Sequence, residues 1–217
     1  MNNLACKAAI FANGEIKDAD ITRLVLIDWD YILACDGGLR HCDAAGIVPD
    51  YIVGDLDSVS EELLDKYQNV PVLRFFAEKD QTDLELAIAH ACDIGAESIV
   101  VFGGLGGRVD HQLANMHVLA QAVERGVEAE IWDWSRDTRI KLIKNHCRLH
   151  KTNGTLVTLI PLTTTVDGIV TEGLKYPLKN ESLIVGFARG VSNQIIDEMA
   201  LVSLKSGLLL VIQTKSL

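Results

Sequence analysis

The sequence predicts an α/β fold in which a doubly wound, Rossmann-like parallel sheet domain precedes a smaller all-β domain. Short apolar runs that end at glycine alternate with amphipathic helical patterns through about the first 130 residues. After Asp133 the helical patterns largely disappear, and strand patterns separated by Gly, Asn and Pro turns follow. We therefore divide the chain into residues 1–138 and 139–217.

The individual elements of the first domain follow from its apolar spacing. Strands are predicted where uninterrupted apolar runs meet a turn signal, at 8–12, 31–35, 51–53, 98–102 and, with a proline near its start, 70–76. Two apolar stripes predict helices, and they consist of Leu84, Ile88, Ala91 and Cys92, and of Leu113, Met116, His117, Ala120 and Val123. Alternation of this kind indicates right-handed βαβ units. In the second domain we expect strands at 155–160, 164–170, 182–187 and 208–214.

Composition and charge limit the classes of protein to consider. The chain has 217 residues, 48% of them hydrophobic and 23% charged, as in an ordinary globular protein. Its formal charge of −10 argues against broad binding to nucleic acid or to anionic membranes, which requires basic surfaces. The N-terminus lacks a signal-peptide pattern, and five scattered cysteines form no C-x-x-C pair. We therefore expect a cytoplasmic protein with reduced thiols.

Acidic residues cluster just beyond the carboxyl ends of the predicted strands, the edge at which open parallel sheets bind ligands. They are Asp36, Asp55, Asp57, Asp80 and Asp83. In an extended segment the side chains of Asp55 and Asp57 leave on the same face. Neighbouring carboxylates repel one another, and hard oxygen ligands suit Mg²⁺. Asp-x-Asp alone is more typical of a solvent-exposed turn, but its position among further aspartates favours a metal site.

The stretch 80–85 also has a local explanation. Thr82 and Glu85 form a capping box, and an acidic Asp83 is favourable in the first turn of a helix. These roles account for Thr82 and Glu85 and partly for Asp83, whereas they leave Asp80 unexplained.

A glycine-rich run, 103–107, offers unobstructed backbone N–H groups, although it matches neither the P-loop nor the G-x-G-x-x-G pattern. Arg108 after it would bind phosphate, and Asp110 would cap a helix that begins near His111. A flexible turn with an exposed arginine explains the same run equally well. We expect Arg40 and His41 to lie on a helix surface, and Trp132 and Trp134 to pack at the domain junction.

Six segments in order resemble those of a bacterial-type thiamine pyrophosphokinase (thiamine diphosphokinase). They are ACDGG at 34–38, PDYIVGDLDS at 49–58, KDQTD at 79–83, GRVDH at 107–111, GLKYPL at 173–178 and GVSNQ at 190–194. Each segment alone is weak, whereas six at family-like spacing over nearly the whole chain are highly specific. The resemblance implies transfer of an intact diphosphate from ATP to thiamine, which gives thiamine diphosphate and AMP.

The same resemblance implies roles for individual residues. Asp55, Asp57 and Asp83 would hold Mg²⁺ and the phosphates, with Asp80 beside them. The nucleotide side would comprise Asp36, Gly37, Gly104, Arg108, Asp110 and His111. The thiamine side would comprise Tyr176, Ser192 and Asn193. The resemblance further implies a nucleotide-binding catalytic first domain, a thiamine-binding β-sandwich as the second domain, and a homodimer.

Diphosphoryl transfer requires mainly positioning and neutralisation of phosphate charge, which aspartate-bound metal, arginine and backbone N–H groups supply. Either Asp57 or Asp83 would accept the proton of the attacking alcohol. Two alternatives use the same first domain: a magnesium-dependent phosphohydrolase, and a nucleotide-binding regulatory protein without catalysis. Neither predicts the Tyr176 and Ser192-Asn193 motifs.

Overall fold

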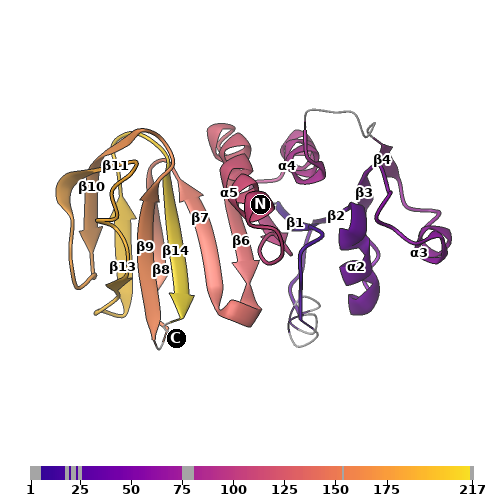
Figure 1. Cartoon of the computed structure of the whole chain (residues 1–217), viewed down its shortest axis with the longest axis horizontal. Coiled ribbons are helices and arrows are strands. Elements are labelled where there is room, and N and C mark those ends of the chain that lie inside the picture. Colours follow the sequence, from indigo (N-terminus) through magenta and orange to yellow (C-terminus); the bar gives the residue numbers. More distant parts are fainter. Residues whose placement is uncertain are drawn as a thin grey trace, which may run out of the picture. The chain divides into compact units, whose positions relative to one another are not determined.

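The computed structural model describes residues 6–17, 20, 23, 26–74, 81–152 and 154–215 (Figure 1). The chain divides into two compact units, Met1–Ser135 and Arg136–Leu217. Each unit has its own core, and each is considered by itself below. Among the described residues, no helix combines the length and the apolar character that a membrane crossing requires.

Six parallel strands form the sheet of the first unit, in the spatial order β6-β5-β1-β2-β3-β4. Their bounds are β1 Lys7–Phe11, β2 Tyr31–Cys35, β3 Tyr51–Gly54, β4 Val72–Arg74, β5 Ser98–Phe102 and β6 Glu128–Asp133. The chain runs from β1 outwards to β4 and then returns to place β5 on the other side of β1. Strand order therefore reverses between β1 and β5, the point at which such sheets bind ligands.

The helices of this unit include α2 (Leu39–Ala45), α3 (Glu61–Lys66), α4 (Asp83–Asp93) and α5 (Val109–Glu124). The predicted stripe of α4 is confirmed for Leu84, Ile88 and Ala91, which are buried. The predicted stripe of α5 is wrong in its first half.

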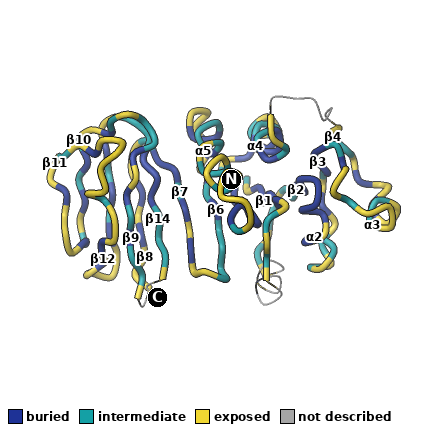
Figure 2. The backbone as a smooth tube through the Cα atoms, in the orientation of Figure 1, coloured by how far each residue is buried: buried dark blue, intermediate teal, exposed yellow. Residues whose placement is uncertain are grey.

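The inward face of α5 begins with polar residues, which explains the error. Gln112 and Asn115 donate hydrogen bonds from their side-chain amides to the glycine-rich run before the helix, while Leu113 is 57% exposed. The buried residues of the helix are Leu119, Ala122 and Val123, all in its second half. Figure 2 colours the chain by burial. Hydrophobic spacing therefore misplaced this face by about one position.

One core of the first unit lies between the sheet and helices α2 and α3. It is built from alternate residues of the strands, because successive side chains point to opposite faces. Its members include Ala9, Phe11, Ala34, Leu39, Cys42, Ile52, Leu56, Val100 and Phe102. Trp132 and Trp134 are partly buried and pack against this core of the first unit.

The second unit consists of two antiparallel sheets, ordered β12-β9-β14-β7 and β11-β10-β13-β8. The strands are β7 Thr138–Ile143, β8 His146–His150, β9 Thr155–Pro161, β10 Thr165–Glu172, β11 Lys179–Ile184, β12 Asn193–Gln194, β13 Met199–Ser203 and β14 Leu209–Lys215. Buried side chains from both sheets share one core, for example Val157 and Val211 from the first sheet and Val166 and Val202 from the second.

The four strands predicted here correspond to β9, β10, β11 and β14. The prediction placed β11 too late, because Gly186 has a φ of 94° and the chain turns there. No strand was predicted at β7, β8 or β13. Charged and polar residues interrupt the apolar pattern of β7 and β8, whereas β13 is a short, largely apolar strand that the pattern did not single out.

Candidate active site

Three aspartates meet beyond the carboxyl ends of β2 and β3. Asp36 follows β2 directly, and Asp55 and Asp57 follow β3. Each offers one carboxylate oxygen, and these three oxygens all lie within 4.8 Å of one another. Parallel neighbouring strands end at the same edge of the sheet, which explains why residues so far apart in sequence meet here.

Asp36 is the innermost member of this aspartate cluster. Its side chain is buried, and its Oδ1 atom has no hydrogen-bond partner among the residues that the structure describes. Buried polar atoms in folded proteins normally have a partner, and a carboxylate oxygen can only accept a bond or bind a cation. Three hard oxygen donors at this spacing, one of them unsatisfied, fit a divalent cation of the magnesium type.

A turn, rather than an extended strand, brings Asp55 and Asp57 together. Leu56 between them has a left-handed φ of 70°, and its side chain is buried in the core under the turn. The backbone N–H of Asp57 donates to Oδ1 of Asp55 over 3.2 Å, and the Ser58 hydroxyl donates to Oδ1 of Asp57 over 3.0 Å. The expectation of an extended segment is therefore wrong, although the two carboxylates do lie close together.

Gly54 separates Asp36 from Asp83. A Cβ atom added at Gly54 would lie 3.2 Å from Cβ of Asp36 and 3.2 Å from Oδ1 of Asp83. Asp83 is the first residue of α4, whose N-cap Thr82 accepts from the backbone N–H of Glu85 over 3.2 Å. The Cys35 thiol, at the end of β2, donates to the Asp83 carbonyl over 3.7 Å.

The predicted aspartates are thus distributed unevenly. Among the described residues, the group with metal-ligand spacing is Asp36, Asp55 and Asp57, while Asp83 lies beside it across Gly54. Asp80 lies outside the described residues.

The glycine-rich run after β5 packs against the loop that follows β1. The Gly14 N–H donates to the Gly103 carbonyl over 2.9 Å, and the Asn115 side chain on α5 donates to the Gly104 carbonyl over 2.8 Å. Gly37, after β2, approaches the same β1 loop, since a Cβ atom there would stand 2.3 Å from Oδ1 of Asn13. Gly37 and Gly104 therefore both belong to one glycine-lined edge at the reversal of strand order.

Arg108 and Asp110 form a two-pronged ion pair with each other. Nε and Nη2 of Arg108 donate to the two carboxylate oxygens of Asp110 over 3.1 and 2.6 Å, and both side chains are exposed. This bond lowers the pKa of the Asp110 carboxyl and raises the pKa of the Arg108 guanidinium. Helix α5 begins at Val109 with Arg108 as its N-cap, so the expected capping role of Asp110 is wrong. His111 lies exposed in the first turn of the same helix.

The expectation that Arg40 and His41 lie on the surface of a helix is confirmed for Arg40 and wrong for His41. His41 is 6% exposed, and its Nε2 atom lies 2.7 Å from the Gly14 carbonyl oxygen. Arg40 is exposed, but its guanidinium donates to the side chain and to the backbone carbonyl of Asn13. The expectation for His41 was wrong because no local pattern reveals a partner 27 residues earlier in the chain.

Two of the three residues expected on the thiamine side bind each other. Asn193 is buried, and its Oδ1 accepts from the backbone N–H groups of Tyr176 over 3.0 Å and of Gln194 over 2.9 Å. Its Nδ2 donates to the Tyr176 carbonyl over 2.7 Å. The Asn193 amide thus fixes the backbone of Tyr176, whose own residue surface is 62% exposed.

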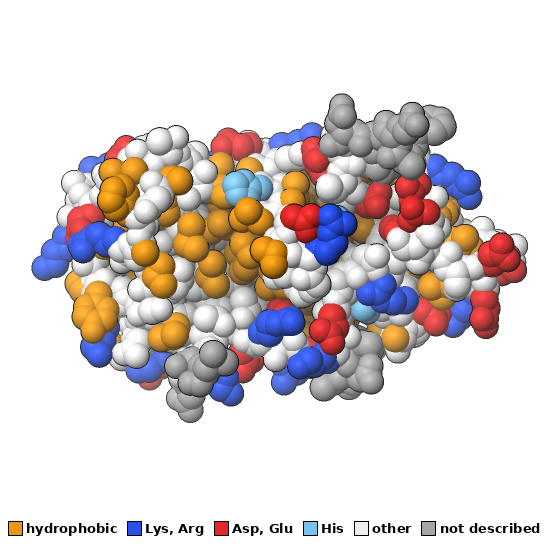
Figure 3. Space-filling model, viewed as in Figure 1, with side chains coloured by type: hydrophobic (Ala, Val, Ile, Leu, Met, Phe, Trp, Pro, Cys, Tyr) orange, Lys and Arg blue, Asp and Glu red, His pale blue; other side chains and the backbone are white. Residues whose placement is uncertain are grey.

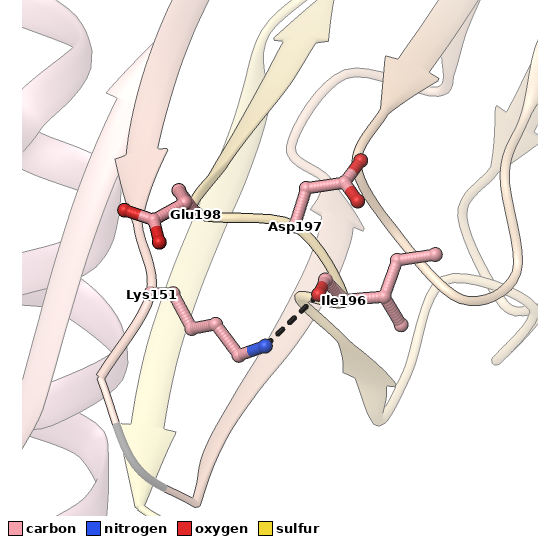
Figure 4. Close-up of a pocket in the computed structure, with 4 residues that line it drawn as sticks. All are labelled: Lys151, Ile196, Asp197 and Glu198. Carbon is pink, nitrogen blue, oxygen red and sulfur yellow. Dashed lines mark hydrogen bonds between the residues drawn. The ribbon is translucent and has the colours of Figure 1, made fainter.

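Ser192 adopts a left-handed φ of 61°, and its N–H donates to the Thr158 hydroxyl over 3.1 Å. A separate open pocket of about 500 Å³ in the second unit is lined by Lys151, Ile196, Asp197 and Glu198 (Figure 4). The Lys151 ammonium there donates to the Ile196 carbonyl over 2.9 Å. None of the predicted site residues that the structure describes lines this pocket.

Comparison with known proteins identifies both parts of the chain. Residues 22–131 match the family model described as thiamin pyrophosphokinase, catalytic domain. Residues 143–209 match the model described as thiamin pyrophosphokinase, vitamin B1 binding domain.

Whole-protein comparisons agree. Thiamine pyrophosphokinase of Bacillus subtilis is 30% identical over 172 residues, which cover 78% of this chain and 80% of that protein. Thiamine pyrophosphokinase 2 of Arabidopsis thaliana is 32% identical over 180 residues, which cover 77% and 66%.

Solved structures show the same relationship. The crystal structure of the Bacillus subtilis enzyme superimposes with a TM-score of 0.85 at 28% identity, over 97% of this chain and 100% of that one. The Geobacillus thermodenitrificans structure gives 0.82 at 28% identity, over 97% and 98%. None of these relatives is a phosphohydrolase or a regulatory protein, so neither alternative is supported. On these matches, the chain belongs to the thiamine pyrophosphokinase family.

Proposed function

We propose that this protein transfers the diphosphate group of ATP to the hydroxyethyl group of thiamine, giving thiamine diphosphate and AMP. The observation that carries this proposal is the aspartate cluster of Asp36, Asp55 and Asp57, because it lies where a doubly wound sheet binds nucleotide phosphates. Membership of an ATP-dependent diphosphotransferase family supplies the reaction and the acceptor.

Mg²⁺ is the cation we assign to this cluster. Asp36, Asp55 and Asp57 would hold it, and Asp83 would lie next to the same phosphates across Gly54. When bound there, a divalent cation would supply positive charge to offset the negative charge of the phosphates. The protein's own residues orient the triphosphate, and either Asp57 or Asp83 accepts the proton of the thiamine hydroxyl. Asp80, outside the described residues, remains assigned to the same site on its motif.

The glycine-lined edge is assigned to the rest of the nucleotide. The backbone N–H groups of the loops that contain Gly37 and Gly104 are the donors we assign to phosphate oxygens. Arg108 reaches a phosphate by exchanging Asp110 for it, and His111 lies one residue further along α5. Since the Arg108–Asp110 pair is exposed, this exchange costs little.

The two units divide the work under this proposal. The Rossmann-like first domain, residues 1–138, binds ATP and carries the chemistry, and the second, a β-sandwich of residues 139–217, binds thiamine. Tyr176 would contact thiamine, Ser192 would lie beside it, and Asn193 would set the Tyr176 backbone in place. A cytoplasmic location completes the proposal, because none of the five cysteines, all of them described, forms a disulfide.

The decisive experiment incubates the purified protein with ATP, Mg²⁺ and thiamine and resolves the products by chromatography. We expect AMP and thiamine diphosphate in equal amounts, with no AMP when thiamine is omitted. Formation of ADP, or AMP release that does not depend on thiamine, would refute the assignment.

A homodimer is part of the proposed function. The second unit exposes large apolar side chains, and Figure 3 shows hydrophobic groups gathered over its strands. Val185, Phe187 and Val191, of which Phe187 is 73% exposed, are the residues we assign to subunit contact. We expect light scattering to give twice the chain mass of 23.7 kDa. A Phe187→Asp variant should shift the protein towards the single-chain mass, and a wild-type protein of single-chain mass would contradict the proposal.

A further inference from the structure

Two side chains in the first turn of α2 form hydrogen bonds to the loop that follows β1. Nη2 of Arg40 donates to the backbone carbonyl of Asn13 over 2.6 Å and approaches that of Gly14 at 3.4 Å, while Nη1 donates to Oδ1 of Asn13. His41, the next residue, contacts the Gly14 carbonyl through Nε2 at 2.7 Å. The side chains of Arg40 and His41 therefore contact three acceptors of the Asn13–Gly14 loop, namely the two backbone carbonyls and Oδ1 of Asn13.

The chemistry of the His41 contact is defined by its surroundings. A carbonyl oxygen can only accept, so Nε2 carries the proton and donates it to Gly14. Burial is the main cause that lowers the pKa of His41, and the neighbouring Arg40 charge acts in the same direction. His41 is therefore a neutral donor, and Arg40 provides charge-assisted hydrogen bonds to the same loop.

The Asn13–Gly14 loop in turn contacts both glycine segments at the glycine-lined edge. Gly14 donates to the Gly103 carbonyl, and a Cβ atom at Gly14 would stand 2.2 Å from that same oxygen. On the other side, the Asn13 side chain lies directly against Gly37, which is bonded covalently to Asp36. A displacement of the Asn13–Gly14 loop would therefore move the segments after β5 and β2, which contact it at Gly103 and Gly37, and disturb the approach to the aspartate cluster.

We propose that Arg40 and His41 are positioning residues for ATP, which hold the Asn13–Gly14 loop in its binding conformation without touching the nucleotide. The inference rests on the proposed function, since it takes the glycine-lined edge as part of the ATP site. An indirect role for Arg40 is favoured because its guanidinium is already bound to Asn13 and Gly14. An indirect role also explains why a buried neutral histidine and an exposed arginine share the same target.

The test compares ATP affinities of variants by calorimetric titration with Mg²⁺ present and thiamine absent. Arg40→Met and His41→Leu remove the donors at nearly constant size, and each is expected to weaken ATP binding about tenfold. His41→Gln retains a side-chain N–H donor and should restore affinity to within about threefold of wild type. In turnover assays, KM for ATP should rise in parallel, while kcat and KM for thiamine change less than about twofold.

Arg125→Met is the matched control. Arg125 also joins two segments of the first unit, through the Ala89 carbonyl and the Asp93 carboxylate, but at the far ends of α4 and α5. Its loss should lower the urea midpoint of unfolding without changing ATP affinity.

Four results would overturn the proposal. Unchanged ATP affinity in both Arg40→Met and His41→Leu would do so, as would equal losses of ATP and thiamine affinity. Loss of affinity in Arg40→Met alone would make Arg40 a direct phosphate ligand instead. Wild-type protein that binds ATP but forms no thiamine diphosphate would refute the proposed function and leave this titration valid, whereas wild type that binds no ATP would refute both.

Discussion

Asp55→Asn is expected to lower kcat for thiamine diphosphate formation by roughly 10²–10³-fold while leaving the fold intact. Asparagine has the shape of aspartate but lacks the negative charge that a divalent cation requires. Asp55 stands within 4.8 Å of the Asp36 and Asp57 carboxylates, so its removal also relieves repulsion among them. The unfolding temperature should therefore stay the same or rise. Turnover and thermal unfolding, measured on one preparation, separate loss of the site from loss of the fold.

Asp57→Asn and Asp65→Asn complete this experiment. Asp57→Asn should reproduce the loss of kcat, because its carboxylate belongs to the same cluster. Asp65, on the exposed surface of α3, undergoes the same change of charge away from the cluster and should keep wild-type turnover. Near-normal turnover in both Asp55→Asn and Asp57→Asn would remove the metal assignment.

Gly38→Ala is expected to destabilise the protein by about 3 kcal/mol, as overpacking against rigid backbone does. The φ of Gly38 is −60°, which alanine adopts readily, so backbone strain is not the cause. The added Cβ would stand 2.0 Å from the carbonyl oxygen of Phe11, a buried strand residue that cannot move aside. Urea denaturation measures the loss as a lower midpoint at unchanged slope.

Gly46→Ala at the other end of α2 is the matched control. Gly46 has a left-handed φ of 66°, and a Cβ there would meet nothing within 4 Å. Its substitution isolates the conformational cost, about 1 kcal/mol. If Gly38→Ala proved no more harmful than Gly46→Ala, the close packing of α2 against the end of β1 would be disproved.

The sequence was informative about the site wherever strand ends supplied the chemistry. Apolar runs that stop at Asp36 and Gly54 predict a parallel sheet, and parallel strands bring their carboxyl ends to one edge. The meeting of Asp36 with Asp55 and Asp57 follows from that topology. The strand pattern also identified β1, β2, β3 and β5, because buried parallel strands are apolar on both faces.

Other features depend on partners that no local pattern reveals. Leu56 takes a left-handed conformation that a leucine avoids in isolation, and the core beneath the turn holds it there. The local sequence predicts that His41 lies on a helix surface, whereas the fold places it beside the Gly14 carbonyl. Asn193 reads as a ligand-binding residue, although its amide is directed to the backbone of Tyr176. In each case tertiary contacts decide the role.

The three loops that meet beyond β1, β2 and β5 also affect the thermodynamics of binding. The Asn13–Gly14 loop is bonded to the β5 loop at Gly103 and packed against Gly37 before any nucleotide arrives. Its conformational entropy is thus lost during folding rather than on association. The Asn13–Gly14 loop is therefore preorganised, so ATP affinity is not reduced by the free-energy cost of ordering it. Mutations that loosen the loops would return that cost to the binding step.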